Sequence, residues 1–390
     1  MKRLLLVSHR AIGQAGGPAA RWRSYARHLP AAGWEVDVVA APEGAGAVEF
    51  ARDASERRSA ARRAQVMGAV GRLADPAFVL FGLRPEALPL SMAWMPRGAR
   101  AVRARSARYD AVLATGPPMV ALLAARAALR AGGPPLVVEL RDLWAGNPAF
   151  DRGGPLLPAL ERWVFAGAAA IVGCTPEAAD DLRRRHPTHA NRVHWVPNGF
   201  EDDLLAQRRT DPPEGRPLTI LHSGTLTADR PLAPLLRVLA ARRDAFRLVL
   251  HGYVAPAIRE EISGAAVPVE IVAASGWADA VARIAAADVT LVTQGHGAGD
   301  ATAIASKVYE YLALGRPVLC LTDGGATEAL LHRLGAGGLC ARLGDPASIA
   351  AALDRLLDGG VPAPVAPERL EPYERARTAR QLAAILDALA

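Results

Sequence analysis

Lysine, asparagine and cysteine are scarce in this chain of 390 residues. Only Lys2 and Lys307 are lysines, so 44 of the 46 basic residues are arginine, and asparagine occurs three times. Such a bias is typical of a genome rich in G and C rather than of a particular fold. Each lysine or asparagine that remains is therefore more informative, and Lys307, inside the chain, needs an explanation.

The cysteines exclude a disulfide framework. Cys174, Cys320 and Cys340 are odd in number and show no paired spacing, whereas small disulfide-rich folds use an even set of closely spaced cysteines. We expect buried thiols in a reducing compartment. Neither a zinc site nor any other metal or cofactor is expected.

Long apolar runs are also missing. The segment "MKRLLLVSHR" has four successive apolar residues after its basic pair, too few for a signal-peptide core. No run approaches the ~20 residues of a membrane span. We therefore expect a cytoplasmic protein.

Positive charge is concentrated in residues 52–108. Twelve arginines face four acidic residues there, a balance of +8, although the whole chain has a net charge of only +7. Nucleic-acid motifs and aromatic platforms are missing, so no nucleic-acid partner is expected. Two explanations remain open: a solvated arginine-rich helical face, or peripheral contact with an anionic membrane at its inner face.

Short apolar runs alternate with helix-compatible stretches in both halves of the chain. The runs lie at residues 3–9, 34–40, 110–115, 135–140, 169–173 and 192–199, then at 218–224, 247–252, 267–273, 288–294 and 316–321. Continuous apolar runs are typical of parallel strands covered on both faces. The pattern predicts an α/β protein with two doubly wound parallel sheets.

Pro-rich segments set the domain boundaries. We predict a first domain at 1–205, a linker at 206–217 and a second domain at 218–374. A second Pro-rich stretch at 359–374 precedes a last helix at 375–390, which we expect to pack back on the first domain. Two such domains place the carboxyl ends of their strands on a shared cleft, where α/β proteins bind ligands.

Lys307 lies in "ATAIASKVYEYLALGRPVL", residues 301–319. We predict a helix that begins near Ser306, whose hydroxyl caps it. Lys307 then lies in the first turn, beside the core face, and Glu310 points away from that face. A lysine at this end suits an anion, such as a diphosphate, held by the helix N-terminus. The alternative is a surface pair of Lys307 and Glu310.

Other strand ends supply further candidates. The run at 218–224 ends in Ser223 and Gly224, and Thr225 follows it. Arg230 precedes the next helix, so Arg230 and Lys307 are placed to clamp a diphosphate. A Gly-rich loop after the run at 288–294 contains His296 and Gly297 and suits close backbone contact with a ligand.

In the first half, Arg141 and Asp142 end the run at 135–140. Asp142 is either a base or hydroxyl ligand, or an ion-pair partner of Arg141. The loop after His9, with Gly16 and Gly17, lacks the G-x-G-x-x-G of dinucleotide sites. Its backbone is a candidate for contact with a polar acceptor.

Several of these stretches together resemble one family. "ASKVYEYLALGRPVL" and "GGATEALLHRLGAGGLC", preceded in the chain by "RDLW", "VPNGF" and "HSGTL", are similar to retaining glycosyltransferases of family 4. The resemblance spans nearly the whole chain and is most specific at residues 217–358. It implies a GT-B fold with two Rossmann-like domains, and the most similar members are bacterial enzymes that build surface polysaccharides or glycolipids.

The resemblance implies a role for each candidate residue. The second domain binds a nucleotide-diphosphate sugar through Ser223, Gly224, Thr225, Arg230, His296, Gly297, Ser306, Lys307 and Glu310. Arg230, Lys307 and Asp142 are the catalytic candidates, and His9, Gly16, Gly17, Arg141 and Asp142 bind a hydroxyl acceptor. Transfer is implied to need no metal. One departure is Thr302, where the family has glutamate; Asp300 is its nearest substitute.

Two other functions stay open at this stage. One is a sugar-nucleotide-binding protein of the same fold that has lost transfer, and the other is a sugar-nucleotide epimerase. Base, sugar and acceptor are not encoded in any motif that we find.

Overall fold

The computed structural model describes residues 1–9, 17–41, 49–51, 94–147, 151, 154–211, 217–295 and 298–390. It contains two compact units, Met1–Asn198 with Arg375–Ala390, and Gly199–Glu374. The units divide at Asn198 rather than in the segment 206–217. The reason is local: the Phe200 N–H donates to the Tyr373 carbonyl at 3.1 Å, which ties the segment after Gly199 to the second unit.

The first unit has a seven-stranded sheet in the order β3-β2-β1-β4-β5-β6-β7. All neighbours are parallel except β3, which runs antiparallel to β2 at the sheet edge. The strands are β1 Lys2–Ser8, β2 Trp34–Ala40, β3 Glu49–Ala51, β4 Ala111–Gly116, β5 Leu136–Leu140, β6 Ala170–Gly173 and β7 Val193–Trp195.

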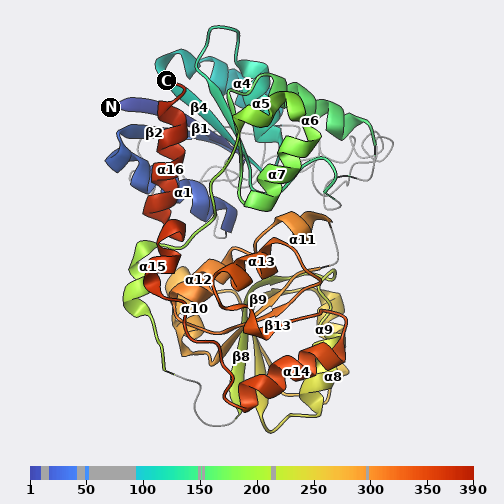
Figure 1. The fold of residues 1–390 in the computed structure, drawn as a ribbon. Coiled ribbons are helices and arrows are strands. Elements are labelled where there is room, and N and C mark those ends of the chain that lie inside the picture. Colours follow the sequence, from blue (N-terminus) through green and yellow to red (C-terminus); the bar gives the residue numbers. More distant parts are fainter. Residues whose placement is uncertain are drawn as a thin grey trace. The chain divides into compact units, whose positions relative to one another are not determined.

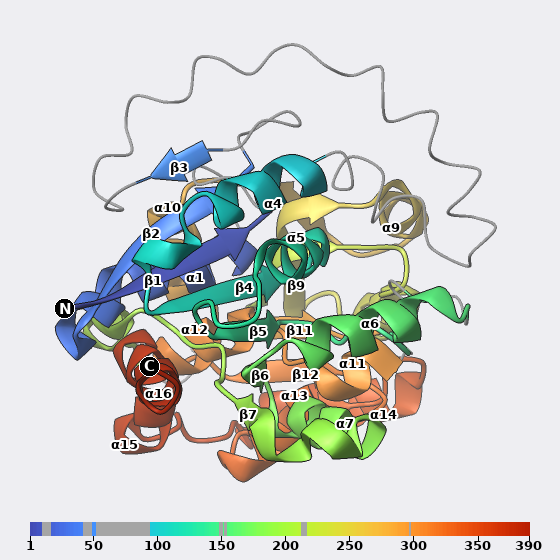
Figure 2. The same cartoon turned by 90° about the horizontal axis from the view of Figure 1, so that it is seen from above.

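Helices cover both faces of this sheet. Successive residues of β1 point to opposite faces, so Leu4 and Leu6 belong to one core and Leu5 and Val7 to another. The first core lies under α1 (Gly17–His28) and α16 (Arg375–Asp387), which contact each other (Figure 1). The opposite face carries α4 (Met95–Arg103), α5 (Val120–Ala128), α6 (Leu156–Ala166) and α7 (Pro176–Arg185), and the separation of α4 and α5 from α16 is visible in Figure 2.

The second unit has six parallel strands in the order β10-β9-β8-β11-β12-β13. They are β8 Leu218–Leu226, β9 Phe246–Val254, β10 Val269–Val272, β11 Val289–Thr293, β12 Val318–Leu321 and β13 Cys340–Ala341. Strand β8 is longer than the predicted run at 218–224 and also includes Thr225 and Leu226. The two-residue strand β13 was not predicted, because it is too short to show a pattern.

The second sheet is also covered on both faces. One face packs on α8 (Ala233–Ala240), α9 (Pro256–Ser263) and α14 (Pro346–Leu357), and the other on α10 (Trp277–Ala286), α12 (Lys307–Ala313) and α13 (Ala326–Arg333). Two further short helices are α11 (Ala298–Thr302) and α15 (Pro367–Leu370). The prediction of two doubly wound, Rossmann-like α/β units is confirmed.

Candidate functional site

Lys307 begins α12, as predicted, and has a partner inside the helix. Its Nζ donates a 2.6 Å hydrogen bond to Glu310 Oε2, and the two side chains are 30% and 14% exposed. The predicted cap is wrong: Ser306 makes no capping bond, because its backbone is already helical (φ −58°, ψ −29°). The structure therefore contains the Lys307–Glu310 ion pair that was the alternative explanation. This pair uses one of the two carboxylate oxygens of Glu310.

Arg230 lies between β8 and α8, as predicted. Its Nη2 is 3.8 Å from Asp300 Oδ1, and both side chains are partly buried. Burial is the main cause that raises the pKa of Asp300; Arg230 opposes this shift and Asp229 adds to it. Arg230 thus comes from the end of β8 and Asp300 from the segment after β11, so two strand ends meet here.

His222 is a further polar residue at this strand, and the sequence analysis missed it. It is buried in β8, and its Nδ1 lies 3.1 Å from the Leu291 carbonyl, so Nδ1 is the protonated nitrogen. Burial, with smaller contributions from Arg230 and Lys307, lowers the pKa of His222 to about 4, and the hydrogen bond to the Leu291 carbonyl opposes this shift. Arg230 and Lys307 thus both contribute positive charge around this imidazole, and the clamp of a diphosphate by the two side chains stays a prediction.

Several buried polar atoms near these residues have no hydrogen-bond partner within the described part of the chain. They are His222 Nε2, Arg230 Nε, Thr293 Oγ1 and Gln294 Oε1. Thr293 ends β11 and Gln294 follows it, beside the end of β8. Buried polar groups are nearly always paired in native proteins, and this mixture of donors and acceptors suits a ligand with both phosphate and hydroxyl groups.

Ser223 and Gly224 support the strand end. The Ser223 N–H donates to Tyr311 Oη at 3.0 Å, and its hydroxyl lies 3.1 Å from His251 Nδ1. Gly224 is the register partner of Gly252 in β9. A Cβ added to Gly252 would lie only 2.1 Å from the carbonyl oxygen of Gly224. The small residues here let two backbones approach each other. His296 and Gly297 lie outside the described residues.

In the first unit, Arg141 binds backbone rather than Asp142. Its Nε donates to the Gly116 carbonyl at 3.2 Å and its Nη2 to the Pro117 carbonyl. Burial lowers the pKa of Arg141, while Glu139 and Asp142 oppose the shift. Arg141 therefore fixes the end of β4, and Asp142 stands beside it at the carboxyl end of β5.

The loop candidates of the first unit are only partly described. The His9 ring packs edge-to-face on Trp94, with ring centroids 5.5 Å apart. Gly17 is the first residue of α1, and Gly16 lies outside the described residues. His9 thus directly follows β1, and its ring packs on Trp94.

A buried network behind these residues also escaped the sequence analysis. Arg21 pairs with Glu139 at 2.9 Å and donates to the carbonyls of Val196 and Pro197 and to Asn198 Oδ1. Arg21 holds the pKa of Glu139 below its usual range although burial opposes this. The rare Asn198 thus has a structural partner, which fixes the end of the first unit.

Family models match both units. A model of the glycosyl transferase 4-like domain matches residues 16–199, and a model of glycosyl transferases group 1 matches residues 217–359. Together they leave only the chain ends and the segment 200–216 unmatched. The chain belongs to the GT4-like glycosyltransferases of GT-B fold. No curated protein sequence matches it.

Solved structures share the fold of this glycosyltransferase over its whole length. HepE from Anabaena, solved with UDP and glucose, has a TM-score of 0.65 at 15% identity, with 100% of each chain covered. A glycosyltransferase from Rickettsia africae has a TM-score of 0.68 at 10% identity, covering 100% of this chain and 98% of its own. The lipopolysaccharide outer core galactosyltransferase WaaB has a TM-score of 0.66 at 12% identity, covering 100% of this chain and 99% of its own.

Thr302 is the position at which the family resemblance implied a glutamate. The Thr302 hydroxyl lies 3.4 Å from the Gly299 carbonyl within α11. Asp300, two residues earlier, instead presents a carboxylate to Arg230. The substitute named from the sequence therefore lies beside a predicted donor-binding residue.

The basic segment of the glycosyltransferase is described only from residue 94 onward. There, Arg103 donates to the Ala127 carbonyl at 2.8 Å and Arg105 to the Ala101 carbonyl at 3.1 Å, both within the protein. Among the described residues, no helix has the length and apolar character needed to cross a membrane.

Proposed function

We propose that this glycosyltransferase moves a hexose from a nucleotide-diphosphate sugar to a hydroxyl acceptor and retains the anomeric configuration. The carrying observation is that buried His222 Nε2 and Arg230 Nε have no hydrogen-bond partner among the described residues, while Arg230 and Lys307 both contribute to the lowered pKa of His222. Two cations beside a neutral imidazole and unpaired polar atoms suit a diphosphate. The UDP and UDP-glucose bound in the Anabaena HepE structures support such a donor.

In this proposal the second unit stabilises the leaving group. Negative charge develops on the diphosphate as its bond to the sugar breaks, and Arg230 and Lys307 are placed to neutralise it. Glu310 keeps one carboxylate oxygen outside its bond to Lys307, which suits a ribose hydroxyl. No metal is needed for this step, because two fixed cations supply the charge.

The first unit supplies the acceptor side. The acceptor hydroxyl oxygen bonds to the anomeric carbon, the carbon–oxygen bond to the diphosphate breaks, and the hydroxyl proton passes to a diphosphate oxygen. Asp142 orients that hydroxyl or takes part in its deprotonation. His9, Arg141 and the start of α1 at Gly17 complete this side, and the roles of Gly16, His296 and Gly297 rest on the family alone. The acceptors proposed are a glycan, a lipid-linked glycan or a small molecule.

A thermal-shift screen over sugar nucleotides tests the donor. A ligand that binds only the native state raises the midpoint temperature of unfolding. At a ligand concentration of 100 times its Kd, the free energy of unfolding increases by about 2.7 kcal/mol. We expect one nucleotide class to do so, and absence of any shift or calorimetric binding would overturn the proposal.

Product analysis tests the reaction. Transfer predicts release of the nucleoside diphosphate in step with a new α-linked or β-linked product that matches the donor's anomeric configuration, and only with acceptor present. A binding protein gives no product, and an epimerase changes the sugar nucleotide without acceptor.

A further inference from the structure

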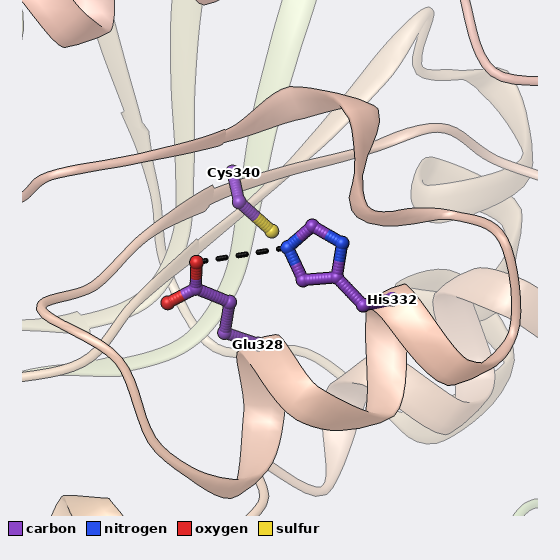
Figure 3. A group of neighbouring side chains, drawn as sticks. All are labelled: Glu328, His332 and Cys340. Atoms are coloured by element: carbon purple, nitrogen blue, oxygen red, sulfur yellow. Dashed lines mark ion pairs between the residues drawn. The ribbon is translucent and has the colours of Figure 1, made fainter.

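Three potential metal ligands meet at the edge of the second sheet. Glu328 and His332 are four residues apart on α13, and Cys340 begins β13. One ligand atom from each residue lies within 4.8 Å of the other two (Figure 3). Across the described residues, this is the one such group of three or more His, Cys, Asp or Glu side chains.

The two oxygens of Glu328 have separate neighbours. Oε1 lies 3.6 Å from His332 Nε2, on the side of the Cys340 sulfur in Figure 3. Oε2 lies 3.3 Å from Arg342 Nη1. Arg342 therefore orients the carboxylate from behind and leaves Oε1 directed at the other two side chains, as outer partners do in metal sites.

The backbone around His332 makes room for its ring. A Cβ at Gly337 would lie only 2.4 Å from His332 Nδ1. The glycine thus lets Nδ1 face the chain of the 3₁₀ turn at Gly337–Leu339, so that Nε2 is the nitrogen directed at Glu328. A side chain at this position would displace the ring.

Cys340 is held by the neighbouring strand. Cys320 of β12 is its register partner. Both cysteines are free thiols. Cys320 is fully buried in the core under α12 and α13, whereas Cys340 is partly exposed on that same side.

We propose that Glu328, His332 and Cys340 bind one divalent cation, with Zn²⁺ the ion that this set of oxygen, nitrogen and sulfur donors fits best. Zinc takes four ligands at about 2.0–2.3 Å, so small side-chain rotations bring the three atoms to one ion and leave one position for water. His332 is 60% exposed. The bound ion ties α13 to the edge strand β13, independently of glycosyl transfer.

Zinc alone is the probe, added to the full, reduced chain after removal of metal with a chelator. Competition with a chromophoric chelator should show one equivalent bound per chain. His332→Ala, Cys340→Ser and Glu328→Gln should each weaken binding at least tenfold. His194→Ala, in the first unit, is the matched control and should leave the affinity unchanged.

Cobalt gives a second readout that does not depend on stability. Co²⁺ at the site should show thiolate-to-metal charge-transfer absorption, which Cys340→Ser removes and Cys320→Ser retains. The proposal is overturned if the reduced chain binds no zinc, if the three variants bind it as the parent does, or if the absorption is missing. Circular dichroism confirms that the exposed-residue variant His332→Ala is folded.

Discussion

Lys307 has an anionic partner in its own helix, Glu310, and the diphosphate of the proposed donor would be a second. A partly exposed ion pair contributes ~0–1 kcal/mol to folding. A hydrogen bond between charged groups in a binding site is worth ~1.5–3 kcal/mol. Removal of the Lys307 ammonium should therefore affect donor binding more than folding.

Lys307→Ala is expected to raise the Kd for the nucleoside diphosphate by about 10- to 100-fold, because one of two cations on the diphosphate is lost. The free energy of unfolding should change by less than about 1 kcal/mol. Isothermal titration calorimetry measures the first quantity and urea unfolding the second. Lys2→Ala, at the only other lysine, is the control, and an unchanged Kd in Lys307→Ala would contradict the assignment.

His222 gives the second unit a built-in acid sensitivity. Its folded pKa of about 4 lies below the ~6.5 of an unfolded histidine. Between these values the unfolded state binds more protons, so stability is fully present above pH ~6.5 and falls as the pH drops towards 4. The slope approaches ~1.4 kcal/mol per pH unit for this one group.

His222→Asn should remove this slope. The asparagine amide still donates to the Leu291 carbonyl but does not titrate, so the difference in stability between parent and variant should shrink as the pH falls from 6.5 to 4. Urea unfolding at several pH values measures it. Parallel curves for the two proteins would show that His222 is not the group responsible.

At the scale of elements, α16 stands out because it follows the second unit in sequence and packs in the first. Ala379, Leu382, Ala383 and Leu386 are buried in the same core as Trp22 and Leu6. Trp34 Nε1 also donates to Asp387 Oδ1 at 3.1 Å. The last helix is thus part of the first unit's core rather than a tail.

Leu382→Ala should destabilise the first unit by about 2–5 kcal/mol, because it removes buried methyl groups and leaves a cavity. Gln381→Ala, the exposed neighbour on the same helix, should change stability by no more than ~0.5 kcal/mol. Thermal and urea unfolding of both variants measure the difference. Similar losses, or none, in the two would mean that α16 does not hold the unit together.

At the scale of the whole molecule, the positive charge is concentrated in one region of the chain. The whole chain has a net charge of +7, and residues 52–108 alone have a net charge of +8. A basic segment near anionic lipid gains about 1 kcal/mol per Lys or Arg at the surface. In the described part of that segment, Arg103 and Arg105 donate hydrogen bonds to backbone carbonyls, while Arg97, Arg100 and Arg108 are exposed.

Vesicles containing anionic lipid should sediment the full chain, and neutral vesicles should not. Added salt should release it, since exposed charges are screened beyond about 8 Å at physiological ionic strength. A variant with Arg57, Arg58, Arg62 and Arg63 changed to Gln should lose the interaction. Sedimentation that ignores lipid charge would favour the solvated-face explanation.

Much of the fold could be predicted because parallel strands buried on both faces are uninterrupted apolar runs. Eleven such runs match β1, β2, β4 to β12 of the structure. Strands β3 and β13 could not be found, since two or three residues show no periodicity. Arg230, Lys307 and Glu310 were identified as ligand candidates and remain predictions, whereas the Ser306 cap was wrong because no sequence rule sets its backbone angles.

The sequence by itself determined the alternation of strands and helices, the family, and the lone Lys307 three residues before Glu310, because these depend on residue types and short spacings. Only the tertiary structure decided what meets across strands. His222 lies inside an apolar run, and its pKa is lowered by charges on Arg230, in the segment after β8, and on Lys307, at the start of the distant helix α12. Cys320 and Cys340 are twenty residues apart yet pair in register. Parallel sheets join residues that are remote in sequence, so such contacts follow from strand order and register, which no local pattern encodes.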